Sequence, residues 1–441
     1  MPPHPDAIAD CVLNAFHALP AKFKPRTLAD GRREWVPTST GDLLMLGAGR
    51  EDALTASHHD SPTKSNDSIP KLTCAALATG MKCLPQNKLG QAKGNVLHDW
   101  HAEVLAIRAF NRFLLDECAD LARKGFKETD TGVWVRWRRR QKDNEQSVSS
   151  HNKDVQQPPF ELHDDVSIHM YCSEAPCGDA SMELTMAEQE DSTPWPTDAQ
   201  SPAINGDLLG RGHFDQLGIV RRKPARPDAP LTLSKSCSDK LAMTQCTSLL
   251  SALTSQLVWP GNVYLDTVVL PVSQCVRTAV ERAFGPLGRM EATTDPDAAT
   301  RKRWGEGGYA FKPFNVTTTA REFDYSKRSS PAADPVPSNL SALSTPHSQE
   351  NLINGVLQGR KQFDPRGASC ASRREMWKAV ADVTAAADPD RSDATRTSTY
   401  DEMKMSTMMG ARERVKSDVR ELSLKGWVRN VGDGEWRLED D

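Results

Sequence analysis

Apolar residues recur with helical spacing through residues 97–124, and this pattern predicts a long amphipathic helix. The positions that share its apolar face are Val104, Leu105, Phe110, Phe113, Leu114 and Leu121. Weaker patterns of the same kind predict helices over residues 180–187, 240–257 and 405–424. Gly426 lies where the last of these helices should stop.

A different pattern, with apolar residues at every second position, predicts strands. Val166, Ile168 and Met170 alternate through residues 165–171, and residues 263–272 form a second apolar run of strand length. Strands that alternate with helices along a chain are typical of the α/β class. We therefore expect a mixed sheet flanked by helices, enlarged by a C-terminal helical region.

Polar stretches without periodicity interrupt these elements. They are rich in Pro, Ser and charged residues, and they cover residues 139–159, 188–205, 326–350 and 385–399. Such segments contain too few apolar residues to pack, so we expect loops or disordered insertions there. The whole chain, residues 1–441, is then one domain enlarged by insertions.

Composition narrows the class of protein. The formal net charge of −4 gives no overall attraction for nucleic acid, so any RNA-binding surface must be a local basic patch. The ten cysteines lack the regular spacing of a disulfide framework, which favours free or metal-bound thiols in the cytoplasm or nucleus. We see no leader and no apolar run of the roughly 18 residues that a membrane span needs. Nothing in the sequence indicates an obligate protein partner.

Two short motifs carry candidate chemistry. His101 and Glu103 stand where the long helix opens, and Cys177 stands in a Pro-Cys-Gly turn after a predicted strand. An imidazole and two thiolates can hold Zn²⁺ with one position open for water. A nearby carboxylate outside the coordination sphere can then move the proton of that water. Residues two apart do not share a helix face, so both His101 and Glu103 must project from the first turn.

The spacing leaves the third ligand open. A short zinc-deaminase motif would place a second cysteine three residues after Cys177, but Ala180 stands there. Two cysteines remain as candidates. Cys172 ends the preceding strand, and Cys237 opens another predicted helix.

Three blocks, residues 97–104 (LHDWHAEV), 175–181 (APCGDAS) and 236–241 (SCSDKL), resemble the metal-site blocks of the RNA adenosine deaminases. The resemblance implies a cytidine-deaminase-like fold, with His101, Cys177 and Cys237 as zinc ligands and Glu103 as the proton shuttle. Residues 31–37, 220–226, 354–359 and 426–430 are similar to blocks of the tRNA-deaminating branch. That branch implies conversion of adenosine to inosine in alanine tRNA, at the purine 3′ of the anticodon.

The same resemblance implies a buried inositol hexakisphosphate. Such a polyanion needs several cations in one cavity. The matching positions are Arg108, Lys240, Arg373, Tyr400, Lys404, Arg414 and Trp427, with Asp99 and Lys240 linking the ligand to the zinc side. The sequence departs from the family at Ile107, where an arginine is common, and at Met243, where the editing branch has another, so the resemblance does not fix the number of contacts. The alternative is that Lys404 and Arg414 belong to a solvated helix face.

Four basic residues are candidates for RNA contact. Lys82 matches a family lysine near the RNA, and Arg221, Lys223 and Arg226 lie in a basic stretch before the third metal block. A solvated loop would explain that stretch equally well.

Two other functions remain open. Editing of structured or messenger RNA would use the same chemistry, but we find no double-stranded-RNA-binding module before the metal site. A non-catalytic RNA-binding subunit with a structural zinc would have no use for Glu103, because structural sites close their fourth position.

Overall fold

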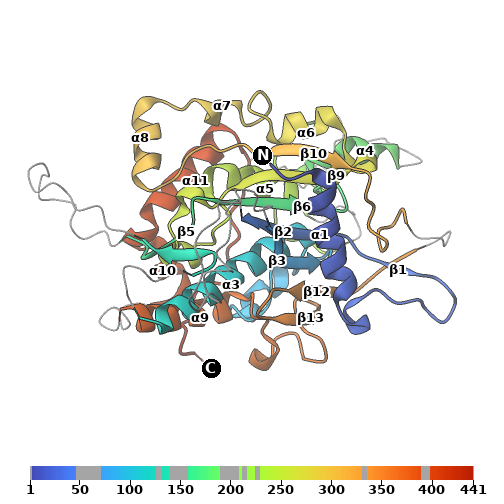
Figure 1. Cartoon of the computed structure of the whole chain (residues 1–441), viewed down its shortest axis with the longest axis horizontal. Helices are drawn as coiled ribbons and strands as arrows, with labels where there is room; N and C mark the ends of the chain where they lie inside the picture. Colours follow the sequence, from blue (N-terminus) through green and yellow to red (C-terminus); the bar gives the residue numbers. More distant parts are fainter. Residues whose placement is uncertain are drawn as a thin grey trace, which may run out of the picture.

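An eight-stranded sheet forms the centre of the protein in the computed structural model (Figure 1). The structure describes residues 2–45, 71–125, 132–138, 157–188, 208–210, 216–223, 229–329, 335–388 and 398–440. In sheet order the strands are β10 (Asn315–Thr319), β9 (Leu265–Pro271), β6 (Val166–Tyr171), β2 (Thr38–Met45), β3 (Lys71–Thr79), β12 (Leu340–Ser344), β13 (Gln349–Ile353) and β14 (Val356–Leu357).

The strand directions divide the sheet into two parts. β9 runs parallel to both β10 and β6. From β6 onward each neighbouring pair is antiparallel, through β2, β3, β12, β13 and β14. The sheet is therefore mixed and flanked by helices, which confirms the predicted fold class.

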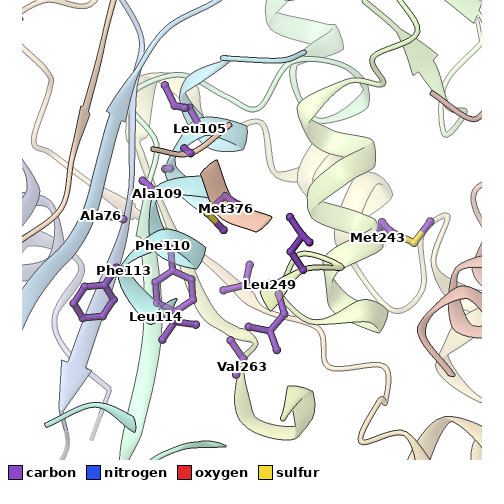
Figure 2. Packing of buried hydrophobic residues seen from close by; sticks show 14 of the residues in the cluster. Ala76, Leu105, Ala109, Phe110, Phe113, Leu114, Met243, Leu249, Val263 and Met376 are labelled. Atoms are coloured by element: carbon purple, nitrogen blue, oxygen red, sulfur yellow. The ribbon is translucent and has the colours of Figure 1, made fainter. Parts of the chain in front are cut away.

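Helices cover both faces of the sheet. Each face of the sheet carries its own hydrophobic core. On one face Leu77 of β3 packs in the same core as Phe16 of α1 (Pro5–Ala18). On the other face the adjacent Ala76 packs in the same core as Phe110 of α3 (Ala102–Arg123). Figure 2 shows α3 between the sheet, marked by Ala76, and a second layer of buried side chains. The labelled members of that layer are Leu249, Val263 and Met376. Thus α3 is buried on two sides, which fixes the position of its first turn.

The other elements surround this core. The remaining helices are α2 (Leu89–Ala92), α4 (Met182–Ala187), α5 (Cys237–Thr247), α6 (Arg277–Phe284), α7 (Glu291–Thr294), α8 (Ala298–Glu306), α9 (Arg373–Ala387), α10 (Tyr400–Met405) and α11 (Gly410–Leu422). Short two-stranded ladders pair β1 (Glu34–Trp35) with β11 (Val336–Pro337), β4 (Val135–Trp137) with β5 (Phe160–Leu162), and β7 (Leu208–Leu209) with β8 (Arg221–Arg222). None of the helices in the described part of the chain is long and apolar enough to cross a membrane.

Three predicted helices have different limits. The helix expected from residue 97 begins at Ala102, because His101 has an extended backbone and acts as its N-cap. The helix expected over 240–257 begins at Cys237 and ends at Thr247, where Ser248 takes a positive φ of 60°. The helix expected from residue 405 is divided, since α10 ends at Met405 and α11 begins at Gly410.

The prediction of an insertion over residues 326–350 is wrong. This segment supplies β11, β12 and the start of β13, and Leu340, Ala342 and Leu343 are buried. The strand was missed because Ser338, Ser341 and Ser344 give it a polar composition, although Ser338 and Ser341 are also buried. Most of the other three predicted insertions lies outside the described residues, apart from residues 157–159, 188, 385–388 and 398–399.

Candidate metal centre

The first candidate ligand is positioned by the start of α3. The backbone N–H of His101 donates to Oδ1 of Asp99 at 3.0 Å, which helps to hold the residue in its extended conformation. Glu103 is the second residue of the helix and is 7% exposed. Both side chains therefore project from the same helix start, as the His-x-Glu motif requires.

The second ligand, Cys177, lies in the turn between β6 and α4. Gly178 has a φ of 104°, and a Cβ atom there would lie 2.3 Å from Oγ of Ser236. A side chain at position 178 would therefore hold the two cysteine segments apart. The backbone N–H of Ser238 donates to the Cys177 carbonyl at 3.0 Å, which fixes the two segments together.

The third ligand, Cys237, opens α5, and Ser236 caps that helix by accepting from the Asp239 N–H at 3.1 Å. The Cys237 backbone N–H donates to Sγ of Cys177 at 3.3 Å. The side-chain hydrogen bond with the Cys237 thiol, with Lys223 and His101 nearby, holds the pKa of Cys177 well below its usual range against the effect of burial. Cys177 is therefore prepared to bind a metal as a thiolate.

The three side chains converge. One ligand atom each from His101, Cys177 and Cys237 lie within 4.8 Å of one another, and Sγ of Cys177 is 3.9 Å from Nδ1 of His101. Tetrahedral zinc, with Zn–S bonds of about 2.3 Å and Zn–N bonds of about 2.0 Å, needs ligand separations of roughly 3.5–3.8 Å. These residues could hold a metal ion with small movements of their side chains.

Cys172, the other candidate, lies outside this cluster. Its Sγ is 3.2 Å from Oγ of Ser39 in the core, and burial raises its thiol pKa. The geometry therefore selects Cys237, as the resemblance implied.

Glu103 lies beside the cluster without belonging to it. Its Oε2 atom is 3.2 Å from Sγ of Cys237. Burial, together with the negative charge of Cys177, raises the pKa of Glu103. A carboxyl group with a raised pKa can both accept and return a proton near neutral pH, which suits general acid–base catalysis.

A buried ionic network supports the ligands from behind. Oδ2 of Asp99 accepts hydrogen bonds from Lys223 at 2.8 Å, from Ser234 at 2.5 Å and from Lys240. Burial alone would raise the pKa of Asp99, but Lys223 and Lys240 hold it well below its usual range. Lys223 also donates to Sγ of Cys237 at 3.4 Å, so the network reaches the metal ligands directly.

The RNA-contact predictions for Arg221 and Lys223 are wrong. Lys223 is 4% exposed, and Arg221 is 1% exposed with its guanidinium donating to the carbonyl of Gly210 at 3.1 Å. The backbone N–H of Arg221 donates to Asp239, so this basic stretch braces α5 from inside the protein. Arg226 lies outside the described residues.

Lys82 is half-buried, and its Nζ contacts Oδ1 of Asn339. It lies in the segment that follows β3 and runs beside the start of α3, since its carbonyl accepts from the Trp100 N–H at 3.0 Å. A contact of Lys82 with RNA stays a prediction.

Several predicted polyphosphate ligands gather around Tyr400. The guanidinium of Arg373 lies 5.1 Å from the centre of the Tyr400 ring, and Nζ of Lys404 lies 5.7 Å from it. Burial and the charge of Arg373 lower the pKa of Arg108 to about 10. Nζ of Lys235, a residue that we did not predict, lies 5.9 Å from the ring of Trp427.

On α11 the structure brings different residues to this cluster than we expected. Arg414 is exposed, whereas Arg412 is buried and Lys416 is partly buried. Residues two apart lie on opposite sides of a helix, whereas residues four apart share a side. Arg414 therefore points to the solvent, while Arg412 and Lys416 point into the protein. Burial, Arg412 and Lys404 lower the pKa of Lys416 to about 7, against the effect of its ion pair with Glu413 at 2.9 Å.

Two ion pairs that we did not predict brace the metal-site loops. Arg289 pairs with Asp239 at 2.5 Å, and Arg282 pairs with Asp179 at 3.1 Å. Both aspartates belong to the sequence blocks that carry the cysteines. The acidic residues in those blocks were visible signals, but their arginine partners are 50 and 103 residues away.

Comparisons with known proteins agree with this geometry. Residues 76–431 match the model of the adenosine-deaminase (editase) domain. The chain is 38% identical over 323 residues to tRNA-specific adenosine deaminase 1 of Schizosaccharomyces pombe, covering 73% of this chain and 69% of that protein. It is 30% identical over 274 residues to the Saccharomyces cerevisiae protein of the same name, covering 60% and 58%. Double-stranded RNA-specific editase B2 of Mus musculus is 26% identical over 215 residues, covering 44% and 24%. The chain therefore belongs to the adenosine-deaminase (editase) domain family.

Proposed function

We propose that this protein is a zinc-dependent enzyme that converts adenosine to inosine in tRNA. The observation that carries the proposal is the buried Glu103 carboxyl, 3.2 Å from Sγ of Cys237 and beside three converging ligands. A structural zinc site has no role for such a group, which argues against a non-catalytic subunit. Two relatives named tRNA-specific adenosine deaminase 1 support tRNA as the substrate class.

Each residue of the site has its own chemical role. His101, Cys177 and Cys237 would hold the zinc, which supplies the Lewis acidity that makes water nucleophilic near neutral pH. Glu103 accepts the proton of that water as the oxygen bonds to C6 of the base. It passes that proton to the ring nitrogen, then takes the proton of the new hydroxyl group on C6 and delivers it to the amine, so that the C6–N6 bond breaks, ammonia leaves and the C6 carbonyl of inosine forms. The raised pKa of Glu103 suits both transfers.

For the substrate, we propose the adenosine 3′ of the anticodon in alanine tRNA. An anticodon-loop base is partly unstacked, so moving it into a pocket costs less than flipping a base out of a duplex, which costs a few kcal/mol. Lys82, half-buried beside the start of α3, is our candidate for contact with the RNA near this base.

Inositol hexakisphosphate is the proposed second ligand. Its support is the group of cations around Tyr400, where burial and, after it, cationic neighbours lower the pKa of Arg108 and Lys416, although Lys416 also pairs with Glu413 and Arg373 with Asp433. The negative charge of a bound polyanion would offset the repulsion between these cationic side chains, and its phosphates would accept charge-assisted hydrogen bonds from them. Mass spectrometry of the acid-denatured protein should release one inositol hexakisphosphate per chain, and release of none would overturn this part of the proposal.

The function is tested by incubating unmodified alanine tRNA with the purified protein and sequencing the product. Inosine is read as guanosine, so we expect an adenosine-to-guanosine change at the single position 3′ of the anticodon. A long RNA duplex in a parallel reaction tests the alternative of structured-RNA editing. Changes in the duplex alone would replace tRNA as the substrate, and no change in either RNA would contradict the proposed activity.

A further inference from the structure

A second group of potential metal ligands adjoins the first and shares one residue with it. One ligand atom each from Cys83, Asp99 and His101 lie within 4.8 Å of one another. Cys83 belongs to none of the sequence blocks that indicate the metal site. Its proximity to His101 therefore requires an explanation of its own.

The backbone holds Cys83 in this place. Residues 80–84 run beside residues 98–102, and Cys83 is paired with Asp99 by an isolated antiparallel bridge. The hydrogen bonds on either side of that pair are Trp100 N–H to Lys82 O at 3.0 Å and Leu84 N–H to His98 O at 2.9 Å. The cysteine is thus fixed by the same segment that presents His101.

A second metal ion at this group is electrostatically unfavourable. The carboxylate of Asp99 already accepts hydrogen bonds from two ammonium groups, those of Lys223 and Lys240. A divalent cation would have to displace both ammonium groups or be repelled by them. The group is therefore better explained as support for His101 than as a metal site.

His101 needs such support. A metal-binding histidine usually donates its second ring N–H to a carboxylate, carbonyl or water, which fixes the orientation of the ring. Nδ1 of His101 faces Cys177, and the Asp99 oxygens accept from the His101 backbone, Ser234 and the two lysines. We propose that Cys83 is a positioning residue whose sulfur accepts the hydrogen bond of the other ring nitrogen of His101.

The inference rests on the metal site proposed above, and the test separates the two. Zinc affinity is measured by competition with a chromophoric chelator for the wild type, Cys83→Ala, Cys83→Ser and the control Cys275→Ala. Cys275 is a half-buried cysteine near the start of α6, outside both ligand groups. Absorption spectra of the Co²⁺-substituted proteins report the ligand geometry without using activity.

We expect Cys83→Ala to weaken zinc binding by about 10- to 100-fold and to change the Co²⁺ spectrum. Cys83→Ser keeps a hydrogen-bond acceptor and should recover most of the affinity, and Cys275→Ala should match the wild type. If the wild type itself binds no zinc, the proposed function fails. If the wild type binds zinc and Cys83→Ala binds it equally well with the same spectrum, this inference alone is overturned.

Two further outcomes also decide the matter. Two zinc ions in the wild type and one in Cys83→Ala would make Cys83 a ligand, which contradicts the positioning role. If circular dichroism shows that Cys83→Ala does not fold, Cys83→Ser decides alone. Wild-type affinity and spectrum in that variant support the hydrogen bond, and a 10-fold loss contradicts it.

Discussion

Nζ of Lys223 lies 3.4 Å from Sγ of Cys237, and the same ammonium group donates to Asp99 at 2.8 Å. Lys223 therefore joins a metal ligand to the buried carboxylate that also holds Lys240. Because Lys223 is only 4% exposed, its charge must be balanced entirely by these neighbours.

Replacing Lys223 by methionine should be strongly destabilising. The change leaves Asp99 with one ammonium partner and removes the cation beside Cys237, so the free energy of unfolding should fall by about 3–5 kcal/mol. Lys240→Met is the comparison, since Lys240 is 25% exposed and its removal leaves Lys223 in place. Urea unfolding measures both variants, and a Lys223→Met variant as stable as Lys240→Met would contradict the central position of Lys223.

Metal content should separate the two candidate cysteines. Cys237→Ala removes a ligand and should lose the metal, whereas Cys172→Ala should retain it because its sulfur contacts Ser39 in the core. Elemental analysis of the dialysed proteins measures the difference. Retention of metal by Cys237→Ala, or its loss from a folded Cys172→Ala, would reverse our assignment.

Glu174 should make stability depend on pH. Burial raises the pKa of Glu174 to about 7, although Arg328 lies 2.5 Å away. The folded state then binds a proton that the unfolded state releases near its ordinary pKa, so stability is present at low pH and decreases as pH rises from about 4.5 to 7. The full effect is about 3 kcal/mol.

Glu174→Gln should remove this decrease and become more stable relative to the wild type as pH rises. Glu183→Gln is a control of opposite sign, because Arg282 lowers the pKa of Glu183 against the effect of burial. Loss of the Glu183 carboxylate in this variant should lower the stability of the protein above pH 4.5. Parallel stability curves for the wild type and Glu174→Gln between pH 4.5 and 7 would refute the assignment.

Replacing Lys416, which lies near the cluster around Tyr400, should change the stability of the protein in opposite directions with and without a bound polyanion. With inositol hexakisphosphate bound, Lys416→Met should lose a charge-assisted hydrogen bond and about 1.5–3 kcal/mol of stability. Arg414→Met, exposed on the same helix, should change little. Without a polyanion, Lys416→Met should stabilise the protein, because partial burial and the charges of Arg412 and Lys404 disfavour the ammonium more than its ion pair with Glu413 at 2.9 Å favours it, which is why its pKa is lowered to about 7. Stabilisation of the protein as purified would therefore argue against the ligand.

The metal site was more predictable than the residues that support it. His101, Glu103 and Cys177 stand in short motifs at element boundaries, so local sequence identifies them. Spacing could not choose between Cys172 and Cys237, because the choice depends on how β6 and α5 pack. Lys223 looked like part of a solvated basic stretch, and only its burial against Asp99 reveals its role.

The elements of the fold also differ in how well the sequence predicts them. The buried helix α3 and strand β6 have clear periodic patterns, whereas β12 contains serines and follows a Pro-rich stretch. β12 is a strand because β3 and β13 pair with it on its two sides, and that pairing is not local information. For α11, the helix was predictable but its inward face was not, so Arg414 was chosen where Arg412 and Lys416 point inward.

The most direct test of the central claim compares Glu103→Gln with the wild type on alanine tRNA, with zinc content and folding measured on the same samples. The amide keeps the size of the side chain but cannot accept the proton of water. We predict equal zinc, an unchanged fold and inosine formation reduced by at least about 100-fold. Inosine formation near the wild-type rate by a zinc-loaded Glu103→Gln protein would contradict the account.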